Sequence, residues 1–132
     1  MITAALRNLT LAAAIALPLV AIGGQRANAQ EYYGAIARSP STQAHGFSYD
    51  YANQRAAETR ALRECESQAG TGDCEVMVWF RNACGALAEA ANGAAGSGWG
   101  ANRALAEGYA LESCYGVGDG SCRITRWVCT TR

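Results

Sequence analysis

The 132-residue chain contains no lysine and one histidine, His45. Without lysine it cannot form a phosphate-binding P-loop, a Schiff base or a Ser–Lys nucleophile pair. With one histidine, a multi-histidine zinc site is excluded, and Ser–His or Cys–His catalysis would depend on His45 alone. Eleven arginines balance eleven acidic residues, so the chain lacks the positive excess typical of nucleic-acid-binding proteins. These absences predict no cofactor and no nucleic-acid partner.

The N-terminal segment has the pattern of a secretory signal peptide. Arg7 supplies the positive charge, Leu9–Ile22 is an apolar run, and Ala27-Asn28-Ala29 is a small-residue cleavage box. The apolar run is shorter than the roughly 20 residues that a membrane-spanning helix needs. We therefore predict that residues 1–29 are cleaved and that no membrane anchor remains. The mature domain, residues 30–132, is expected to be periplasmic or secreted.

Six cysteines lie in the predicted mature domain, at positions Cys65, Cys74, Cys84, Cys114, Cys122 and Cys129. Their even number and the predicted export favour three disulfides. The chain has no C-x-x-C pair, since even the closest two cysteines have six residues between them, and we expect no metal site. A domain of this size buries only part of its surface on folding and therefore gains from covalent cross-links.

The mature domain contains an internal duplication. When Cys65 is aligned with Cys114, glycine, cysteine and tryptophan landmarks recur in the same order, which indicates two copies of one unit. We place the repeats at about residues 32–83 and 84–132. The matched landmarks are Gly34–Ala37 with Gly85–Ala88, Gly46-Phe47 with Gly98-Trp99 across a small gap, Asn53 with Asn102, Ala61 with Ala110, Cys74 with Cys122, and Trp79 with Trp127.

Each repeat is predicted to contain two strands, a helix, a cysteine-bearing loop and a third strand. The first repeat has strands over 33–38 and 46–51, a helix that Asn53 can cap, and a strand over 75–80. The second has strands over 85–90 and 98–101, a helix over 103–114 and a strand over 123–129. We expect an α+β fold: an internally duplicated β-β-α-β unit whose mostly antiparallel sheet carries two helices on one face.

The duplication restricts the disulfide pairing. Requiring the pairing to be unchanged when the repeats are exchanged removes roughly half of the fifteen possibilities. We favour Cys65–Cys74 and Cys114–Cys122 within the repeats and Cys84–Cys129 between them. The other symmetric pairings, including one with Cys65–Cys84, remain open, because Trp79 and Trp127 stand at different distances from Cys84 and Cys129.

Several stretches of the mature chain carry a family resemblance. They are Tyr33–Thr42, Phe47–Tyr51, Ala56–Cys65, Cys74–Ala88 and Trp127–Cys129, of which the Trp-Phe-Arg-Asn-x-Cys stretch at 79–84 is the most specific. On these residues the chain resembles the bacterial secreted family named domain of unknown function 4189. The resemblance covers nearly all of the mature chain. It implies a small exported cysteine-bearing domain and supplies no catalytic residues.

One strand offers a binding face. In the strand 75–80, Val76, Val78 and Phe80 alternate with Met77 and Trp79. If the helices cover the valine face, Met77, Trp79 and Arg81 point outward, together with Arg123 and Trp127 of the second repeat. Tryptophans flanked by arginines can stack on sugar rings or anchor a protein partner. We expect this face to bind an unknown protein or a cell-envelope glycan; the alternative is that both tryptophans belong to the core.

No set of residues predicts catalysis. His45 lies in a predicted loop without an evident nucleophile, and Glu58, Glu64 and Glu66 stand among arginines as solvated helix carboxylates do. We therefore predict a non-enzymatic exported binding module; an inhibitor or immunity-type protein is one form that such a module takes. The alternatives are an envelope hydrolase that uses His45 or the helix carboxylates, and a structural component of the envelope.

Overall fold

The computed structural model describes residues 30–132, so the predicted signal peptide, residues 1–29, lies outside the described residues. The order strand, strand, helix, strand occurs twice, as the sequence predicts. The first repeat contains β1 (Tyr33–Arg38), β2 (His45–Tyr51), α1 (Gln54–Ala69) and β3 (Glu75–Arg81). The second contains β4 (Cys84–Glu89), β5 (Ala95–Gly100), α2 (Arg103–Tyr115) and β6 (Arg123–Cys129).

An asparagine caps the N-terminus of each helix, and each helix buries a stripe of small residues. The Asn53 side chain accepts a hydrogen bond from Ala56 N at 2.8 Å, and the Asn102 side chain accepts one from Leu105 N at 3.0 Å. These bonds satisfy backbone donors that the first turn of a helix leaves free. The buried stripes are Ala57, Ala61 and Cys65 in α1 and Ala106, Ala110 and Cys114 in α2. The small side chains let each helix lie close to its sheet.

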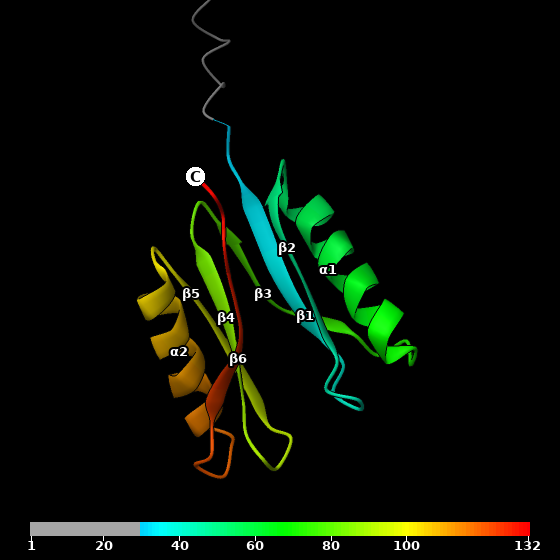
Figure 1. Cartoon of the computed structure of the whole chain (residues 1–132), viewed down its shortest axis with the longest axis vertical. Coiled ribbons are helices and arrows are strands. Elements are labelled where there is room, and N and C mark those ends of the chain that lie inside the picture. The colour runs from blue at the N-terminus through cyan, green and yellow to red at the C-terminus, as the bar shows by residue number, and fades with distance from the viewer. Residues whose placement is uncertain (1–29) are drawn as a thin grey trace, which may run out of the picture.

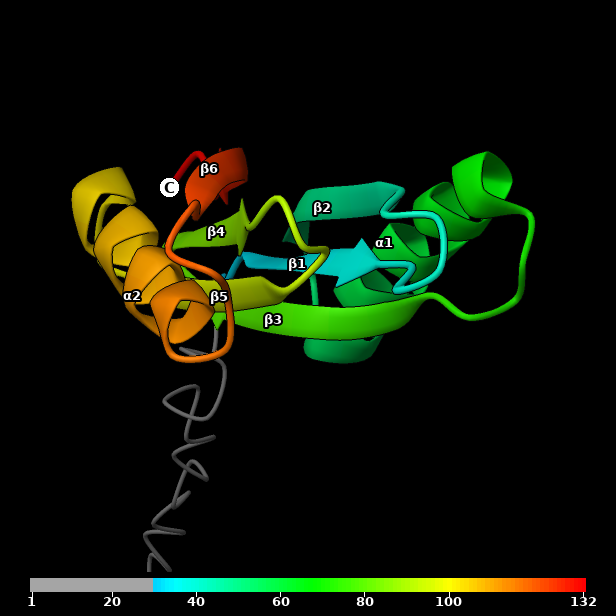
Figure 2. The same ribbon diagram turned by 90° about the horizontal axis from the view of Figure 1, so that it is seen from below.

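The strands form two three-stranded antiparallel sheets. Sheet 1 has the order β2-β1-β3 and sheet 2 the order β5-β4-β6. The two sheets face each other, and each helix covers the outer face of its own sheet, so the layers run α2, sheet 2, sheet 1, α1 (Figures 1 and 2). The predicted α+β class and the duplicated unit are confirmed. The expectation of one sheet with both helices on one face is corrected, because each central strand is buried on both of its faces.

Three apolar clusters hold these layers together. One lies between α1 and sheet 1, one between α2 and sheet 2, and one between the sheets. Val78 and Phe80 belong to the cluster between the sheets, so the prediction that a helix covers their face is wrong. The helix-facing side of β3 carries Trp79 instead. The cluster between the sheets consists of Ile36, Val78, Phe80, Ala83, Leu87 and Val128.

Two equivalent glycines make room for the largest side chain between the sheets. A Cβ atom on Gly34 or on Gly85 would overlap the ring of Phe80, which lies between these two backbone positions. Phe80 is almost completely buried there. The duplicated glycine therefore allows a close approach of β1 and β4 to the same aromatic ring.

The three disulfides pair the cysteines as the sequence favoured. Cys65–Cys74 and Cys114–Cys122 tie the end of each helix to the segment before the following strand. Cys84–Cys129 joins directly opposite residues of β4 and β6. The expectation that this third disulfide links the repeats is wrong, because Cys84 opens the first strand of the second repeat. Since all six cysteines are paired in this way, the repeats are not cross-linked by a disulfide.

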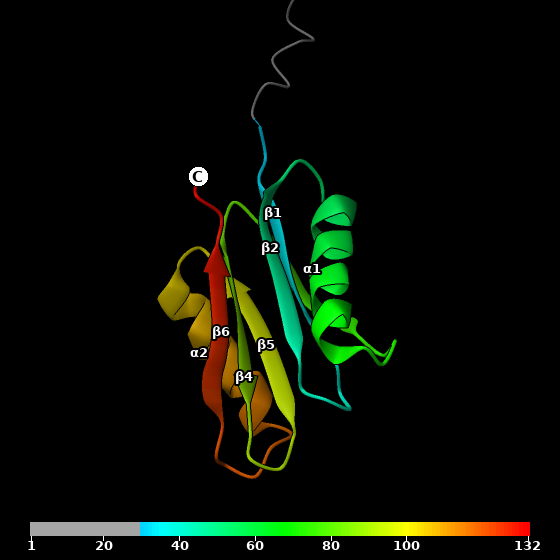
Figure 3. The ribbon, with the colours of Figure 1, turned by 45° about the vertical axis from the view of Figure 1, so that its right-hand side comes forward.

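The two repeats are related by an approximate two-fold symmetry. β1 lies against β4, β3 against β5 and β2 against β6, an arrangement that exchange of the repeats leaves unchanged (Figure 2). Figure 3 shows α2 behind the strands of sheet 2 and α1 beside β2. The register corrects one part of the sequence alignment: Ile36 pairs with Phe47 and Leu87 with Ser97, so Phe47 corresponds to Ser97, and Tyr49 to Trp99. The extra residue in β2 is accommodated near Asp50, which has a φ of 60°.

Among residues 30–132, no helix is long and apolar enough to cross a membrane.

Candidate functional site

The residues of the predicted binding face are accessible but do not form one face. Trp79 and Trp127 are 42% and 43% exposed, Arg81 and Arg123 are exposed, and Met77 is half-buried. β3 is an edge strand of sheet 1 and lies against β5, whereas β6 is an edge strand of sheet 2 and lies against β2. The structure therefore places Trp79 and Trp127 on opposite sides of the molecule.

The two equivalent tryptophans have different neighbours. The guanidinium carbon of Arg103 lies 4.0 Å from the centre of the Trp127 ring, in cation–π geometry. Trp79 stacks on Tyr33, with 6.2 Å between ring centres. The residue of the first repeat that corresponds to Arg103 is Gln54. Trp127 is thus covered by a cation of its own chain, whereas no cation among residues 30–132 covers Trp79.

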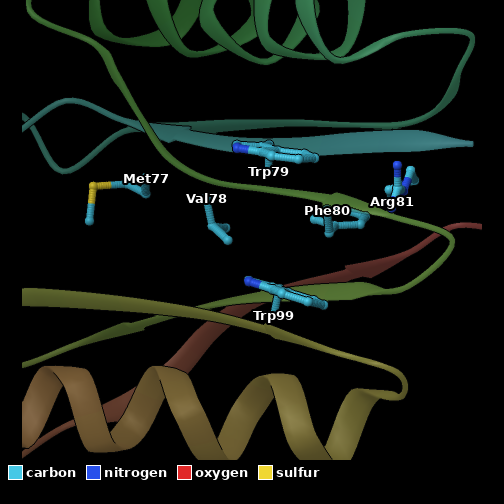
Figure 4. A pocket seen from close by; sticks show the side chains of 6 residues that line it. All are labelled: Met77, Val78, Trp79, Phe80, Arg81 and Trp99. Atoms are coloured by element: carbon cyan, nitrogen blue, oxygen red, sulfur yellow. The ribbon is translucent and has the colours of Figure 1, made fainter.

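A cleft of about 470 Å³ lies beside β3 (Figure 4). Its volume is in the range of ligand-binding pockets. It is lined by Met77, Val78, Trp79, Phe80 and Arg81 of β3 and by Trp99 of β5. Trp79 and Trp99 lie on opposite sides of the β3 chain in Figure 4. The cleft therefore brings three of the predicted binding residues together with a tryptophan that the sequence did not single out.

Trp99 faces the cleft because of the glycines around it. Cβ atoms on Gly96, Gly98 and Gly100 would overlap α2, so these residues lie on the helix side of β5. Residues alternate between the faces of a strand, and Ser97 and Trp99 therefore lie on the side of sheet 1. Trp99 is 59% exposed. The alternating glycines in residues 96–100 are the sequence signal for the direction of Trp99. They reveal that direction only once it is known that α2 covers the glycine side of β5.

On the opposite side of the molecule, between β2 and β6, larger side chains occupy the equivalent positions. Arg126 of β6 corresponds to Val78, and Phe47 of β2 to Ser97. The Arg126 guanidinium carbon lies 4.5 Å from the centre of the Phe47 ring, and its Nε donates to His45 Nδ1 at 3.3 Å. We call the β2–β6 side the closed side and the β3–β5 side the open side. At the equivalent positions the open side has the smaller side chains Val78 and Ser97, and Val78 lines the cleft.

The C-terminal residues also close the β2–β6 side. Thr131 donates from its backbone N to Asp50 Oδ1 at 2.9 Å and from its hydroxyl to Oδ2 at 2.5 Å. On the open side, the Ser97 hydroxyl donates to the Met77 carbonyl at 2.8 Å and so links the two sheets.

His45 has a structural environment. It is the first residue of β2, opposite Arg38, and not part of a loop as predicted. Burial, followed by the positive charge of Arg126, lowers the pKa of His45 below its ordinary value. The neutral imidazole is thus favoured, and its Nδ1 is already occupied by the Arg126 hydrogen bond.

The three helix carboxylates proposed from sequence each have a local partner. Glu58 accepts a hydrogen bond from Gln54 Nε2 at 2.6 Å, and Glu64 lies 3.9 Å from Arg60 Nε. Glu66 accepts from the backbone N of Gly72 at 2.8 Å and of Cys74 at 2.6 Å. Glu66 therefore holds the disulfide loop between α1 and β3 in place.

Glu66, Asp73 and Cys74 lie close enough together to resemble a metal-binding cluster. The Cys74 sulfur is bonded to Cys65, however, and Asp73 accepts hydrogen bonds from the Ser39 hydroxyl at 2.6 Å and from Ser41 N at 3.1 Å. The bonds from Ser39, Ser41 and Thr71 hold the pKa of Asp73 far below its usual range. These contacts organise the loop and leave no thiolate for a metal.

Two comparisons with known proteins relate most of the described domain to others. Residues 33–129 match the family model described as Domain of unknown function (DUF4189). The chain is also similar to the NMR structure of Rv1813c from Mycobacterium tuberculosis, with 33% sequence identity over 75% of each chain and a TM-score of 0.55. A search of curated proteins found no match. The chain therefore belongs to the DUF4189 family.

Proposed function

We propose that this protein is a non-enzymatic binding module and that its ligand, a protein or a cell-envelope glycan, occupies the cleft between β3 and β5. The observation that carries the proposal is the pair Trp79 and Trp99, two half-exposed indoles that line one cleft. Tryptophan buries a large apolar area at low conformational cost and is enriched among residues that dominate binding energy. The closed side, where Arg126 covers Phe47, indicates that the fold does not need this cleft.

The disulfides agree with a site of action outside the cytoplasm. Three disulfides are consistent with an extracellular or periplasmic protein. The predicted signal peptide supports export by an independent route. A rigid, cross-linked domain of this size suits binding, including the blocking of another protein's site, because little conformational freedom is lost when the complex forms.

A hydrolase centred on His45 has less support. Its Nδ1 accepts from Arg126, and the carboxylates Glu58, Glu64 and Glu66 hold other groups of the fold. General acid–base catalysis needs a group free to exchange a proton with the substrate. The cleft with the paired tryptophans is also on the other side of the molecule from His45.

Replacing the cleft tryptophans tests the proposal. Trp79→Ala and Trp99→Ala should each weaken binding of the protein to envelope material by about tenfold or more, the usual loss at a binding hot spot. Trp127→Ala is the matched control, because Trp127 has the same exposure as Trp79 and lies on the opposite side. Co-sedimentation with peptidoglycan and pull-down from envelope protein extract measure the retention.

Thermal unfolding of the same three variants separates binding from folding. All three should retain the fold, since each replaced side chain is at least two-fifths exposed. Equal retention of all variants, or retention of none including the parent protein, would contradict a binding cleft and favour a structural component of the envelope. A collapse of thermal stability in Trp79→Ala would assign that tryptophan to the core.

A further inference from the structure

We propose that the ligand of this cleft is an extended polypeptide segment that adds as a strand to the free edge of β3. The inference rests on the proposed function and names its ligand class. Strand addition uses main-chain hydrogen bonds for affinity and alternate side-chain contacts for specificity.

The residues that line the cleft show its direction. Met77 to Arg81 are consecutive, and successive residues of a strand point to opposite faces. A cleft over one face would be lined by every second residue. A cleft lined by all of them runs along the edge of the strand, over about 16 Å at roughly 3.3 Å per residue. This elongated shape fits an extended chain.

The edge of β3 is free to pair. β3 is the outer strand of sheet 1, and within residues 30–132 no backbone hydrogen bond closes its outer side. Val76–Phe80 is an uninterrupted apolar run on this strand. Natural edge strands are usually protected by charged residues, and the equivalent strand β6 carries Arg126, which turns inward onto Phe47. The corresponding residue of β3 is Val78, so this edge lacks the protection that its duplicate has.

The length of the paired segment follows from a β-bulge. Ile36 pairs with Val78 but Ala37 with Val76, so Met77 is an extra residue that interrupts the regular edge. The Met77 carbonyl is bonded to the Ser97 hydroxyl. Regular pairing is therefore available from Val78 to Arg81, enough for a segment of about four or five residues. Its alternate side chains would contact Trp79 on one face and Trp99 on the other.

The positive charge of Arg81 specifies the residue type at one end of the polypeptide ligand. Arg81 lies at the end of the cleft, half-exposed, and its Nη1 is 3.6 Å from Glu31, which is itself exposed. An ion pair between two exposed side chains contributes little stability. The Tyr33 hydroxyl donates to Glu31 Oε2 at 2.9 Å, so Glu31 keeps this partner when it leaves Arg81. An acidic residue of the ligand can take the place of Glu31. The expected ligand thus alternates apolar residues along a short extended segment and carries an acidic residue beside Arg81.

A second copy of this chain fits the edge less well. Antiparallel pairing of two Val78–Arg81 stretches would set Val78 of one copy opposite Arg81 of the other. The acidic residue of β3, Glu75, lies three residues beyond Val78, on the far side of the bulge. A second copy therefore places no carboxylate beside Arg81, and so we assign the edge to a different polypeptide.

Selection from a displayed library of random linear peptides tests the inference. The purified full-length protein is the target. Peptides that also bind the Trp99→Ala variant are discarded, because they bind outside the cleft. We expect enriched sequences to alternate apolar residues and to carry Asp or Glu at one end. On an Arg81→Glu variant the enriched terminal residue should change to Lys or Arg, because the charge at that end of the cleft is reversed.

Backbone N-methylation of a selected peptide tests main-chain pairing. In an added strand, alternate residues direct their N–H toward β3 and the others direct it to solvent. Methylation at one alternate set should weaken binding by about tenfold or more, roughly the loss of one or two hydrogen bonds, while methylation at the other set leaves binding unchanged. Equal tolerance at both sets would overturn strand addition.

The remaining outcomes separate the inference from the proposed function. If the peptides selected on the Arg81→Glu variant carry the same terminal charge as those selected on the parent protein, the peptides do not bind at β3 and the inference is overturned. If no peptide is enriched but peptidoglycan is retained in a Trp99-dependent manner, the polypeptide inference fails and the binding cleft stands. If neither is bound, both fail. Size-exclusion chromatography tests for a dimer. If a concentration-dependent dimer forms and the Arg81→Glu variant abolishes it, a second copy of the chain occupies the edge and the inference is overturned.

Discussion

At the scale of single residues, a buried ion pair between the repeats joins two equivalent positions. Arg38 ends β1 and Glu89 ends β4, and Arg38 Nε lies 2.7 Å from Glu89 Oε2. The Arg38 side chain is 6% exposed and that of Glu89 13%. Arg38 Nη2 also donates to the Gly93 carbonyl at 3.0 Å. This pair is sheltered from water, so each charge depends on the other for solvation.

Glu89→Ala should lower the free energy of unfolding by about 3 kcal/mol or more, because it leaves the Arg38 charge buried without its carboxylate. Denaturant unfolding followed by circular dichroism measures the loss. The double variant Arg38→Met/Glu89→Leu is the control and should recover most of the stability, since apolar side chains need no charge partner. A double variant as unstable as Glu89→Ala would show that packing, not an unpaired charge, causes the loss.

His45 makes folding stability depend on pH. Its pKa in the folded protein is lowered, by burial first and by Arg126 next, so the unfolded chain binds the proton more readily. The stabilisation is complete above the ordinary histidine pKa of about 6.5 and is lost as the pH falls below it. The melting temperature should therefore decrease as the pH is lowered from 7 to 5. In His45→Gln this part of the profile should be flatter, whereas an unchanged profile would assign the effect to other groups.

At the scale of the elements, the sequence predicts the helices better than the sheets. Asn53 and Asn102 followed by alanine stripes at helical spacing identify both helices and their starts, because capping and amphipathicity are local properties. The alternation in residues 75–80 identifies a strand with two faces, but cannot say which face meets a helix. That choice depends on the second sheet, which is a long-range contact.

One signal for the second sheet was present in the sequence. Gly34–Ala37 and Gly85–Ala88 contain no polar residue, as expected for strands covered on both faces. The strand β5, by contrast, has three glycines in six residues, a composition that disfavours strands. It forms because Gly96 and Gly98 allow the backbone of α2 to lie against it. The cleft could not be predicted, since it needs Trp99 on β5 and Trp79 on β3 to be placed together.

At the scale of the whole molecule, the repeats are held together by packing and by the chain itself. The apolar cluster between the sheets, the Arg38–Glu89 pair and the short connection Asn82-Ala83 join them. No disulfide adds to these contacts, because Cys84 and Cys129 belong to the same sheet. The sequence predicts which cysteines pair, but strand membership decides what the pairing connects.

Peptide mapping without reduction checks this assignment. Trypsin cleaves after arginine, so Cys65 and Cys74 fall in the peptide 64–81, and Cys114 and Cys122 in the peptide 104–123. We expect one cross-linked pair in the mass spectrum, peptide 82–103 with peptide 127–132. A cross-link between the peptide 64–81 and any peptide that follows Arg81 would contradict the structure.

The Arg38–Glu89 pair also determines which halves can assemble. Because the two residues occupy equivalent positions across the approximate two-fold axis, two copies of the first repeat would bring arginine against arginine, and two copies of the second glutamate against glutamate. Only the pairing of a first repeat with a second repeat places arginine opposite glutamate, so that the two charges neutralise each other. Each half thus selects its counterpart over itself, and this preference would persist if two chains exchanged halves across the short Asn82-Ala83 connection.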